Sequence, residues 1–446
     1  MNILHYNLGF PPFRTGGLIN YAISLINEEI KYGHNACMIW PGRIGTFKHK
    51  TFIFKKIING IKSFEIINPL PIPYDEGINE IDNFIKNGDE NVYVDFFEEN
   101  KFDIIHIHTL MGLHKSFITA AKKKNIKIIF TTHDYFGICP RVKLYNPNVG
   151  CLDGNVSFNN CTKCNTCALS YNKIILLQSN MYKILKDSKI IKSLRQKHRK
   201  KTFDNNFYNK NSGNMVTTDD YLTLQNYYMS ILNYCDIIHC NSKVSYNIYS
   251  KYINKDKLII LPITHNKILN NKKIRSYDDA KIRISYLGPL SEEKGYFYLK
   301  DCIELSENKN IVLNIYNEPK LKASYENVFP KYNIDDLKVV FDNADVLVVP
   351  SLWMETFGFT LLEALSYGVP VITSDNVGAS ILLNENYGYT YNSYHKQELI
   401  NILDELNSID LSNKNKNIFK NFNVPLFTDH CKEILEIYND MNENLN

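Results

Sequence analysis

The chain has 446 residues, of which 44% are hydrophobic, so it is long enough for two or three domains with well-formed cores. A formal net charge of +4 is too small to indicate nucleic-acid binding by itself. There is no apolar run of about 18 residues, and the start MNILHYNLGFPPF lacks the basic and apolar parts of a secretory signal, so we expect a cytoplasmic protein.

The first half of the chain alternates predicted strands with predicted helices. A strand over 2–7 leads through the Pro/Gly loop GFPPFRTGG into a helix over 18–31, whose apolar residues recur at helical spacing. Further strands are predicted over 36–40, 103–108, 127–132, 236–240 and 258–261, and further helices over 113–123, 221–234 and 244–252. The polar stretch 266–279 is the predicted linker.

The second half repeats the alternation. Strands are predicted over 283–287, 311–316, 346–349 and 371–373, and helices over 296–305, 335–342, 397–406 and 425–439. Two such series predict an α/β protein with two doubly wound, Rossmann-like domains that face each other across a cleft. We place the domains at 1–265, with an insertion at about 136–220, and at 266–424, and expect 425–446 to pack back toward the first domain.

The stretch VLVVPSLWMETFGFTLLE, residues 346–363, predicts a buried strand, a short loop and the start of a helix. A helix N-terminus can hold an anion, and the carboxylates Glu355 and Glu363 stand on either side of this one. A sugar nucleotide has a matching layout, with a diphosphate between two groups of hydroxyls. The alternative is an exposed acidic pair that the helix dipole favours.

Several motifs, in this order along the chain, resemble retaining glycosyltransferases of family 4, which have the GT-B fold. PPFRTGGLINY resembles the family's Pro-rich loop with its Gly pair, and GPLSEEKG resembles its GRLxxxKG. ADVLVVPSLWMETFGFTLLEALSYGVPVITSD matches its most diagnostic segment, which contains Glu355, seven residues and Glu363. HDYFGICPRVKL resembles a subset with a Cys-rich insertion after an HDYxxxCPR-like motif.

The resemblance implies roles for the matching residues. Glu363 would bind the ribose hydroxyls, Glu355 a hydroxyl of the transferred sugar, and Lys294 the diphosphate. His133 would reach the transferred sugar, so the catalytic candidates are Glu355, His133 and Lys294. The remaining donor-binding candidates are backbone positions beside the phosphates: Gly16, Gly17, Phe357, Gly358 and Phe359.

The chain also departs from the family pattern. Pro289 stands where the family usually has a phosphate-binding Arg, for which Arg14 or Arg141 could substitute. Ser380 replaces a frequent acidic residue, and 317–344 is short for a region that usually holds an extra strand. These departures leave the donor sugar open.

The resemblance implies a hexosyltransferase of bacterial surface polysaccharide biosynthesis, acting on a glycan or a lipid-linked acceptor. No Asp or Glu is placed as a nucleophile with a paired acid, so we expect front-side displacement in which the leaving diphosphate helps to deprotonate the acceptor. No Asp-x-Asp motif is apparent, so we expect metal-independent transfer with no required cofactor. A UDP-sugar is the expected donor in preference to a GDP-sugar.

Five of the ten cysteines lie between Cys139 and Cys167, which favours a metal over disulfides in a cytoplasmic protein. Their spacing, C-x11-C-x9-C-x2-C-x2-C, predicts a structural zinc ion. The predicted ligands are Cys139, Cys151, Cys164 and Cys167, with Cys161 as a substitute. Free thiols and an iron–sulfur cluster are the alternatives.

Two further features have less specific readings. The basic amphipathic segment 183–201 predicts contact with anionic lipid on the inner face of the membrane, and the alternative is a solvated surface helix. His106 and His108 share one face of a strand, but no third metal ligand is evident, so we interpret them as ordinary strand residues.

Two other functions are compatible with the sequence. A sugar-nucleotide epimerase of the same fold would want additional acid/base residues in the cleft. A non-enzymatic binding module with zinc would use the basic segment for nucleic acid, but that segment lacks interleaved aromatic residues, so no nucleic-acid partner is expected.

Overall fold

The computed structural model describes residues 1–45, 50–151, 154–179, 216–278, 280–319 and 321–443, and the single residues Tyr182, Leu185, Ser188 and Ser193. The predicted membrane-binding segment 183–201 therefore lies outside the described residues, except for three of them. The chain forms two compact units. The first comprises Met1–His239, Tyr249–Ile259 and Glu433–Asn446, and the second comprises Cys240–Ile248 and Ile260–Lys432.

The first unit is built on an eight-stranded sheet with the order β3-β4-β2-β1-β5-β6-β7-β8. Its strands are β1 (Asn2–Tyr6), β2 (Asn35–Pro41), β3 (Phe52–Ile58), β4 (Ile61–Ile67), β5 (Ile104–Ile107), β6 (Lys127–Thr131), β7 (Ile237–Cys240) and β8 (Leu258–Ile260). The central strands β1, β2, β5 and β6 pair in parallel and are buried, as their continuous apolar sequences predict. Only the edge pair β3–β4 is antiparallel among the registered pairs of described strands.

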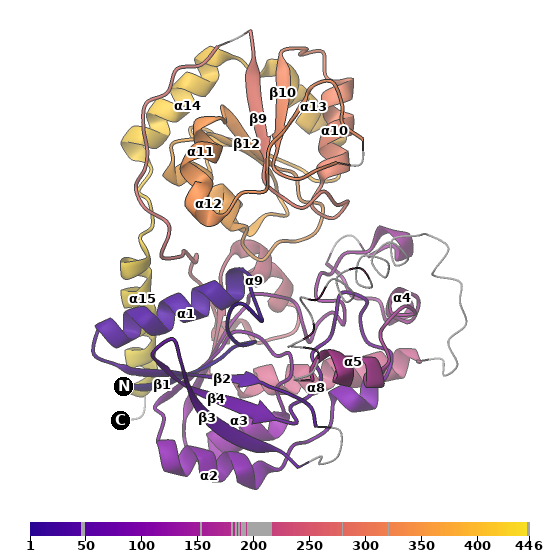
Figure 1. The fold of residues 1–446 in the computed structure, drawn as a ribbon, viewed down its shortest axis with the longest axis vertical. Coiled ribbons are helices and arrows are strands. Elements are labelled where there is room, and N and C mark those ends of the chain that lie inside the picture. The colour runs from indigo at the N-terminus through magenta and orange to yellow at the C-terminus, as the bar shows by residue number, and fades with distance from the viewer. Residues whose placement is uncertain are drawn as a thin grey trace. The chain divides into compact units, whose positions relative to one another are not determined.

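Helices cover both faces of this sheet. The helices are α1 (Gly17–Lys31), α2 (Glu90–Asn100), α3 (Lys115–Lys123), α4 (Phe158–Cys164), α5 (Tyr171–Leu177) and α8 (Thr218–Tyr234), with short 3-10 turns η1 (Ile81–Phe84), η2 (Pro147–Val149) and η4 (Lys255–Lys257). α1 lies on one face, and α2 and α3 lie on the other (Figure 1). The chain moves outward from β1 to β2 in one direction and from β5 to β6 in the opposite direction, so right-handed crossovers put these helices on opposite faces.

The second unit is built on a six-stranded parallel sheet with the order β11-β10-β9-β12-β13-β14. Its strands are β9 (Ile282–Tyr286), β10 (Ile311–Ile315), β11 (Glu326–Val328), β12 (Val346–Val349), β13 (Val371–Ser374) and β14 (Gly388–Tyr391). Its helices are α9 (Lys243–Tyr249), α10 (Tyr296–Leu305), α11 (Leu337–Asp342), α12 (Phe359–Ser366), α13 (Lys396–Glu405) and α14 (Ser408–Asn421), with η5 (Ile334–Asp336) and η6 (Gly378–Leu382). β11 is the extra strand in the region that the sequence analysis found short for the family.

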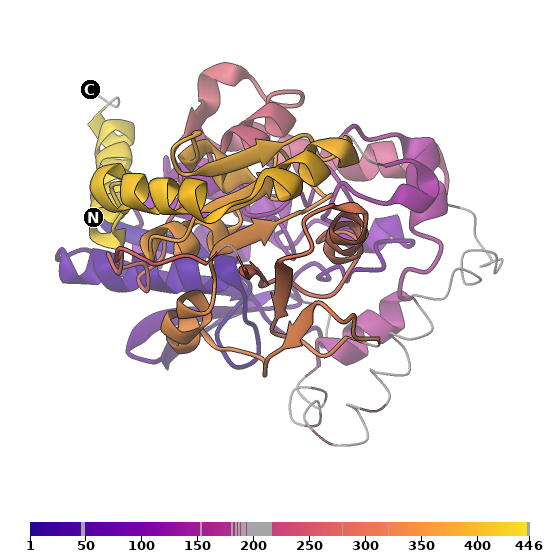
Figure 2. The same cartoon turned by 90° about the horizontal axis from the view of Figure 1, so that it is seen from above.

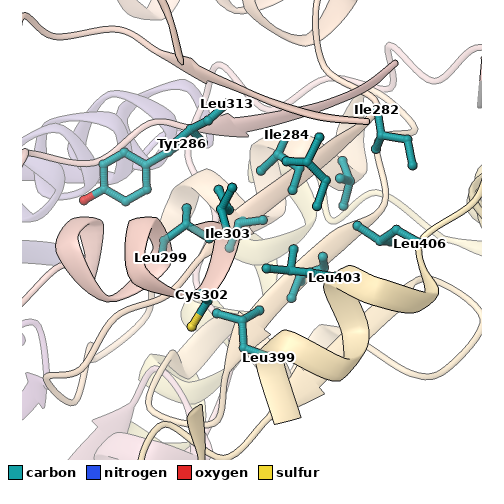
Figure 3. Close-up of a cluster of buried hydrophobic side chains, with 14 of the residues drawn as sticks. Ile282, Ile284, Tyr286, Leu299, Cys302, Ile303, Leu313, Leu399, Leu403 and Leu406 are labelled. Atoms are coloured by element: carbon teal, nitrogen blue, oxygen red, sulfur yellow. The ribbon is translucent and has the colours of Figure 1, made fainter. Parts of the chain in front are cut away.

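The apolar sides of α10 and α13 form the core of the second unit together with β9 and β10. Leu299 and Ile303 of α10 and Leu399 and Leu403 of α13 meet Ile284 of β9 in one buried cluster (Figure 3). The spacing of these leucines and isoleucines every three or four residues explains why both segments form helices with one buried face. This packing fixes β9, whose carboxyl end carries a candidate site loop.

The domain boundaries differ in detail from the prediction. The main division lies at residues 259 and 260 rather than 265 and 266, and the segment Cys240–Ile248 belongs to the second unit. Helix α15 (Phe427–Glu443) belongs to the first unit from Glu433 onward, and its Asn442 donates a 3.5 Å hydrogen bond from Nδ2 to Met1 Sδ. The start of the chain lies beside this helix in both views (Figure 1 and Figure 2). None of the described helices combines the length and the apolar character that a membrane span requires.

Candidate functional site

Two loops meet at the carboxyl ends of the adjacent strands β9 and β12. The first loop runs from Gly288 to Gly295, and the second begins at Pro350. A Cβ atom on Gly295, whose φ is +73°, would lie 1.8 Å from the carbonyl oxygen of Pro350. Leu352 N also donates a 3.0 Å hydrogen bond to Glu293 O. The loops are therefore in direct contact at the edge where parallel sheets bind ligands.

Lys294 and Glu355 form an ion pair between these loops, with Nζ 2.9 Å from Oε1. Lys294 Nζ also lies 4.8 Å from the centre of the Trp353 ring, and the Ser351 hydroxyl donates to Glu355 Oε1. Burial acts to raise the pKa of the Glu355 carboxyl. The Lys294 charge and the hydrogen bonds from Ser351 and Lys294 outweigh burial, so this pKa is lowered from its ordinary value. The pair is thus an ionised carboxylate beside a cation.

The second predicted carboxylate, Glu363, lies in α12 and has a histidine partner. His265 Nε2 is 3.2 Å from Glu363 Oε1, and both residues are buried. The His265 ring packs edge-on against Phe359, with 5.0 Å between ring centres. His265, next to the predicted linker, was not among the residues predicted from the sequence. It lies 98 positions from Glu363, and no local sequence pattern predicts a contact between the two.

Gly358 begins α12 with φ at +94°, the left-handed region that favours glycine. A Cβ atom there would approach Val377 Cγ1 to 2.9 Å and Glu355 Oε2 to 3.2 Å. Phe357 is only 3% exposed, so its side chain belongs to the core and only its backbone could contact a ligand. Phe359 packs edge-on against Phe357 with 5.3 Å between ring centres.

The loop from Gly288 to Gly295 is held by Tyr286 at the end of β9. The Tyr286 hydroxyl donates to Pro289 O at 2.5 Å and is 3.3 Å from Lys294 O. Figure 3 shows that this hydroxyl points away from the cluster of buried apolar side chains. Arg141, one predicted substitute for the missing cation, instead donates to Asp75 O and to Cys164 in the first unit. Arg14 also belongs to the first unit.

Gly16, Gly17 and His133 lie in the first unit, whereas all the other predicted donor-site residues lie in the second. Gly16 has φ at +133° and precedes α1, and a Cβ atom there would meet no atom within 4 Å. His133 follows β6, and its ring centre lies 4.9 Å from that of Tyr21 in α1. Burial, and then the neighbouring His239, lower the pKa of His133 to about 3, so its imidazole is neutral at physiological pH.

In the cysteine region, three predicted zinc ligands influence the residue named as a substitute. Besides burial, the thiols of Cys139, Cys164 and Cys151 raise the pKa of the Cys161 thiol. Cys164 Sγ accepts hydrogen bonds from Asn146 Nδ2 at 3.0 Å and from Arg141 Nη1 at 3.5 Å. Thiols with nearby cationic and amide donors suit a zinc ion chemically.

The sulfur atoms of these cysteines do not gather around one point in the way that a bound metal ion requires. Within the described ranges, one group of His, Cys, Asp and Glu side chains has three ligand atoms within 4.8 Å of one another, and it consists of His5, His106 and His108. The cysteine sulfurs in those ranges form no such group. His5 is the third histidine that the sequence analysis did not find beside His106 and His108.

Residues 267–422 match the family model described as "Glycosyl transferases group 1". A Klebsiella pneumoniae protein described as an "Uncharacterized 41.2 kDa protein in cps region" is 29% identical over 35% of this chain and 46% of its own length. Another, the "Uncharacterized 42.6 kDa protein in cps region", is 24% identical over 98% of this chain and all of its own. The matched region thus covers less than half the length of the first relative and the full length of the second.

Solved structures resemble the chain over nearly its full length. Sucrose-phosphate synthase from Thermosynechococcus elongatus has a TM-score of 0.58 at 12% identity and covers 99% of this chain and 98% of its own. The lipopolysaccharide outer core galactosyltransferase WaaB has a TM-score of 0.57 at 14% identity, covering 98% and 99%. Anabaena HepE in complex with UDP-glucose has 0.53 at 14% identity, covering 98% and 100%. The fold of the chain is GT-B, as the sequence predicted.

Proposed function

We propose that this chain, whose residues 267–422 match the glycosyl transferases group 1 model, transfers a hexose from a nucleotide-sugar donor to a glycan or lipid-linked acceptor of a bacterial surface polysaccharide. The observation that carries this proposal is the Lys294–Glu355 ion pair, which lies beside the start of α12. Glu363 lies further along the same helix and is paired with His265 from outside the helix. One cation, one helix N-terminus and two carboxylates are thereby assembled in one unit.

These groups match the parts of a sugar nucleotide. Lys294 and the first turn of α12 can hold the diphosphate, because a cation and free backbone N–H groups both favour anions. Glu363, oriented by His265, can accept hydrogen bonds from the ribose hydroxyls. Glu355 can accept one from a sugar hydroxyl once Lys294 turns to the phosphates. The UDP-glucose complex of HepE supports a UDP-sugar as donor.

We propose that transfer retains the anomeric configuration by front-side displacement. Charge grows on the leaving diphosphate oxygen, and Lys294, once it has turned to the phosphates of the bound donor, can stabilise this charge together with the α12 N-terminus. The leaving oxygen can then take the proton of the acceptor hydroxyl on the same face of the sugar. On this route no protein carboxylate acts as a nucleophile, and no metal ion is required for charge compensation at the phosphates.

The test is a panel of sugar nucleotides screened by thermal shift, followed by turnover with the best binder. A transferase releases free nucleoside diphosphate only when an acceptor is present, and NMR of the new linkage reports its anomeric configuration. An inverted linkage would contradict the retaining mechanism. Conversion of the sugar nucleotide without acceptor would instead indicate an epimerase. Failure of every sugar nucleotide to bind would favour a non-enzymatic binding module.

We further propose that the Cys-rich region holds a structural zinc ion through Cys139, Cys151, Cys164 and Cys167, with Cys161 as a substitute. The thiols of Cys139, Cys164 and Cys151 all contribute to the raised pKa of Cys161, which keeps Cys161 a candidate for the fourth ligand. Arg141 and Asn146 would then stabilise thiolate charge through Cys164. Contact of segment 183–201 with anionic lipid also stays a proposal. Flotation with liposomes that contain or lack anionic lipid tests it, and binding that does not respond to salt would oppose it.

A further inference from the structure

The indole of Trp353 lies beside the Lys294–Glu355 ion pair in the second unit. Lys294 Nζ is 4.8 Å from the centre of the Trp353 ring and 2.9 Å from Glu355 Oε1, so one ammonium group contacts both the ring face and the carboxylate. Among aromatic rings, indole attracts a cation most strongly. Trp353 therefore belongs to the ion pair as a third member, and it was not among the residues predicted from the sequence.

The backbone holds the loop that carries Trp353. Trp353 N donates a 3.3 Å hydrogen bond to Glu293 O, and Leu352 N donates to the same oxygen at 3.0 Å. The loop is also tied to Asn376, which follows β13. Asn376 Nδ2 donates to Leu352 O at 2.7 Å, and Glu355 N donates to Asn376 O at 2.9 Å. The places of the indole and of the carboxylate are thus fixed by hydrogen bonds of the loop.

The indole nitrogen of Trp353 is a buried donor. The side chain is only partly buried as a whole, but Nε1 is shielded from solvent and has no hydrogen-bond partner among the residues that the structure describes. A buried N–H group without a partner is costly, so native structures rarely keep one. Burial acts to raise the pKa of the Glu355 carboxyl, and the Trp353 side chain is one of the groups that outweigh burial and lower it.

Donor binding, as proposed above, would take the cation away from Glu355. This residue is only 8% exposed, and a buried carboxylate that loses its cation is strongly destabilised. The Ser351 hydroxyl still donates to it, but one neutral hydrogen bond is weaker than a contact with an ammonium group. Trp353, two residues away in the same loop, carries the hydrogen that the carboxylate would then need.

We propose that Trp353 is a positioning residue for donor binding: it holds Lys294 over its ring before the donor binds, and gives its indole N–H to Glu355 once Lys294 has turned to the phosphates. The second step rests on the proposed function, whereas the contact of Lys294 with the ring does not. No covalent bond changes, and one hydrogen bond replaces one ion-pair contact. Glu355 stays ionised, and its other lone pairs can accept from a sugar hydroxyl.

The competing explanation is that Trp353 only packs against the loop and the lysine. A phenylalanine would then serve nearly as well, because its ring also offers an apolar surface and a face for the cation. Only the indole N–H distinguishes the two roles. Trp353→Phe, which removes this group and keeps an aromatic ring, is therefore the informative variant.

The direct test is NMR of the full-length chain labelled with 15N in tryptophan. The chain has two tryptophans, so the spectrum has two indole signals, and the signal that Trp40→Phe retains belongs to Trp353. Saturation with UDP should move the Trp353 indole hydrogen downfield, because a hydrogen bond to a carboxylate deshields it. Uridine lacks the phosphates that draw Lys294 away, so it should leave this signal in place. Equal movement with uridine and with UDP would overturn the proposal.

A second spectrum tests the exchange of partners without any donor. Lys294→Met removes the charge but keeps a side chain of similar length against the ring, so Glu355 loses its cation in the free protein. The Trp353 indole hydrogen should then lie downfield before UDP is added, and UDP should move it little further. A signal that keeps its wild-type position in Lys294→Met would refute this role of the N–H group.

Binding and rate measurements separate this role from packing. Trp353→Phe should raise the Kd for UDP and the donor KM by about 10- to 100-fold, the effect of losing a hydrogen bond to a charged group, with a smaller change in kcat. Trp40→Phe, the same substitution in the first unit, is the matched control and should leave both values unchanged. If Trp353→Phe binds UDP as tightly as the wild type, the indole N–H has no such role.

The outcomes distinguish this proposal from the proposed function. UDP that binds without moving the Trp353 signal refutes the proposal, even in a chain that transfers sugars. If no nucleotide binds, the proposed function fails, and the spectrum of Lys294→Met still decides whether the N–H replaces the cation. If Trp353→Phe does not fold, the wild-type spectra with UDP and with uridine give the same decision.

Discussion

Lys294 Nζ lies 2.9 Å from Glu355 Oε1, so the cation predicted for the diphosphate is already paired with the carboxylate predicted for the sugar. Under the proposed function, Lys294 must therefore exchange Glu355 for the phosphates when the donor binds. Lys294 can turn from the carboxylate to the phosphates, which leaves Glu355 able to accept a hydrogen bond from a sugar hydroxyl. The pair holds both side chains in place before the donor arrives, which lowers the entropy cost of ordering them during binding.

Removing either member of this pair should lower transfer strongly. Lys294→Ala and Glu355→Gln should each reduce kcat/KM by about 10²- to 10³-fold, because each removes a charged group from the reacting centre. Steady-state release of nucleoside diphosphate measures this. Lys300→Ala is the matched control, since Lys300 also pairs with a buried glutamate, Glu326, at 3.4 Å in the same unit. Equal losses in Lys300→Ala and Lys294→Ala would show that the effect is only structural.

The same pair predicts a pH dependence of stability. The folded pKa of Glu355 is lowered from the ordinary value of 4.5, so its contribution is fully present above about pH 4.5 and is lost as the pH falls through the folded pKa. In Lys294→Ala, burial acts without the opposing cation, so the folded pKa should rise and ionised Glu355 should destabilise the protein at neutral pH. Urea unfolding from pH 3 to 7 measures both effects. Identical pH profiles for wild type and Glu355→Gln would contradict this account.

His265 should contribute to nucleotide binding through Glu363. Loss of a hydrogen bond to a charged group is worth about 1.5 to 3 kcal/mol, so His265→Ala should weaken UDP binding by about 10- to 100-fold. His265→Gln, which keeps a donor, should weaken it less. Calorimetric titration with UDP gives both values. His395→Ala is the control, because His395 pairs with Glu398 on the exposed surface of the same unit. The prediction is wrong if His265→Ala and His395→Ala bind UDP equally well.

Gly295 should be intolerant of any side chain. Its φ of +73° and the 1.8 Å approach of a built Cβ to the Pro350 carbonyl combine backbone strain with a steric clash. Gly295→Ala should lose more than about 2 kcal/mol of unfolding free energy, whereas Gly60→Ala, at φ +80° in open space, should lose about 1 kcal/mol. Chemical denaturation followed by circular dichroism measures both. Similar losses in the two variants would remove the clash from the explanation.

The proposed zinc site predicts about one zinc ion per chain. Elemental analysis of Cys164→Ser should show that zinc is lost, because Cys164 belongs to the proposed ligand set and already accepts hydrogen bonds from Asn146 and Arg141. Loss of zinc in Cys167→Ser with retention in Cys161→Ser would support Cys167 as the fourth ligand, and the reverse pattern would replace it with Cys161. Iron in place of zinc, or no metal in the wild type, would exclude the zinc site.

The sequence predicted those parts of the molecule that depend on neighbouring residues. The strand–loop–helix stretch with Glu355 and Glu363 was recognisable because a buried apolar strand, a glycine turn and a helical period follow one another within 18 residues. The parallel sheets followed from the alternation of such units. The edge strands β3 and β11 were missed because β11 has only three residues and β3 exposes apolar side chains, so their sequences lack the pattern of a buried or half-buried strand. The buried strand β4 was missed as well.

The sequence by itself determined the fold class, the two glycine loops and the two carboxylates of the proposed donor site, because each of these is encoded by a local pattern of apolar, glycine and charged residues. Only the tertiary structure decided which side chains meet. His265 reaches Glu363 across 98 positions, and His108 reaches His5 across 103. The His5–His108 contact arises because β1 and β5 pair in the sheet, and the His265–Glu363 contact joins the segment after β8 to helix α12. The local sequence around either partner does not indicate these contacts.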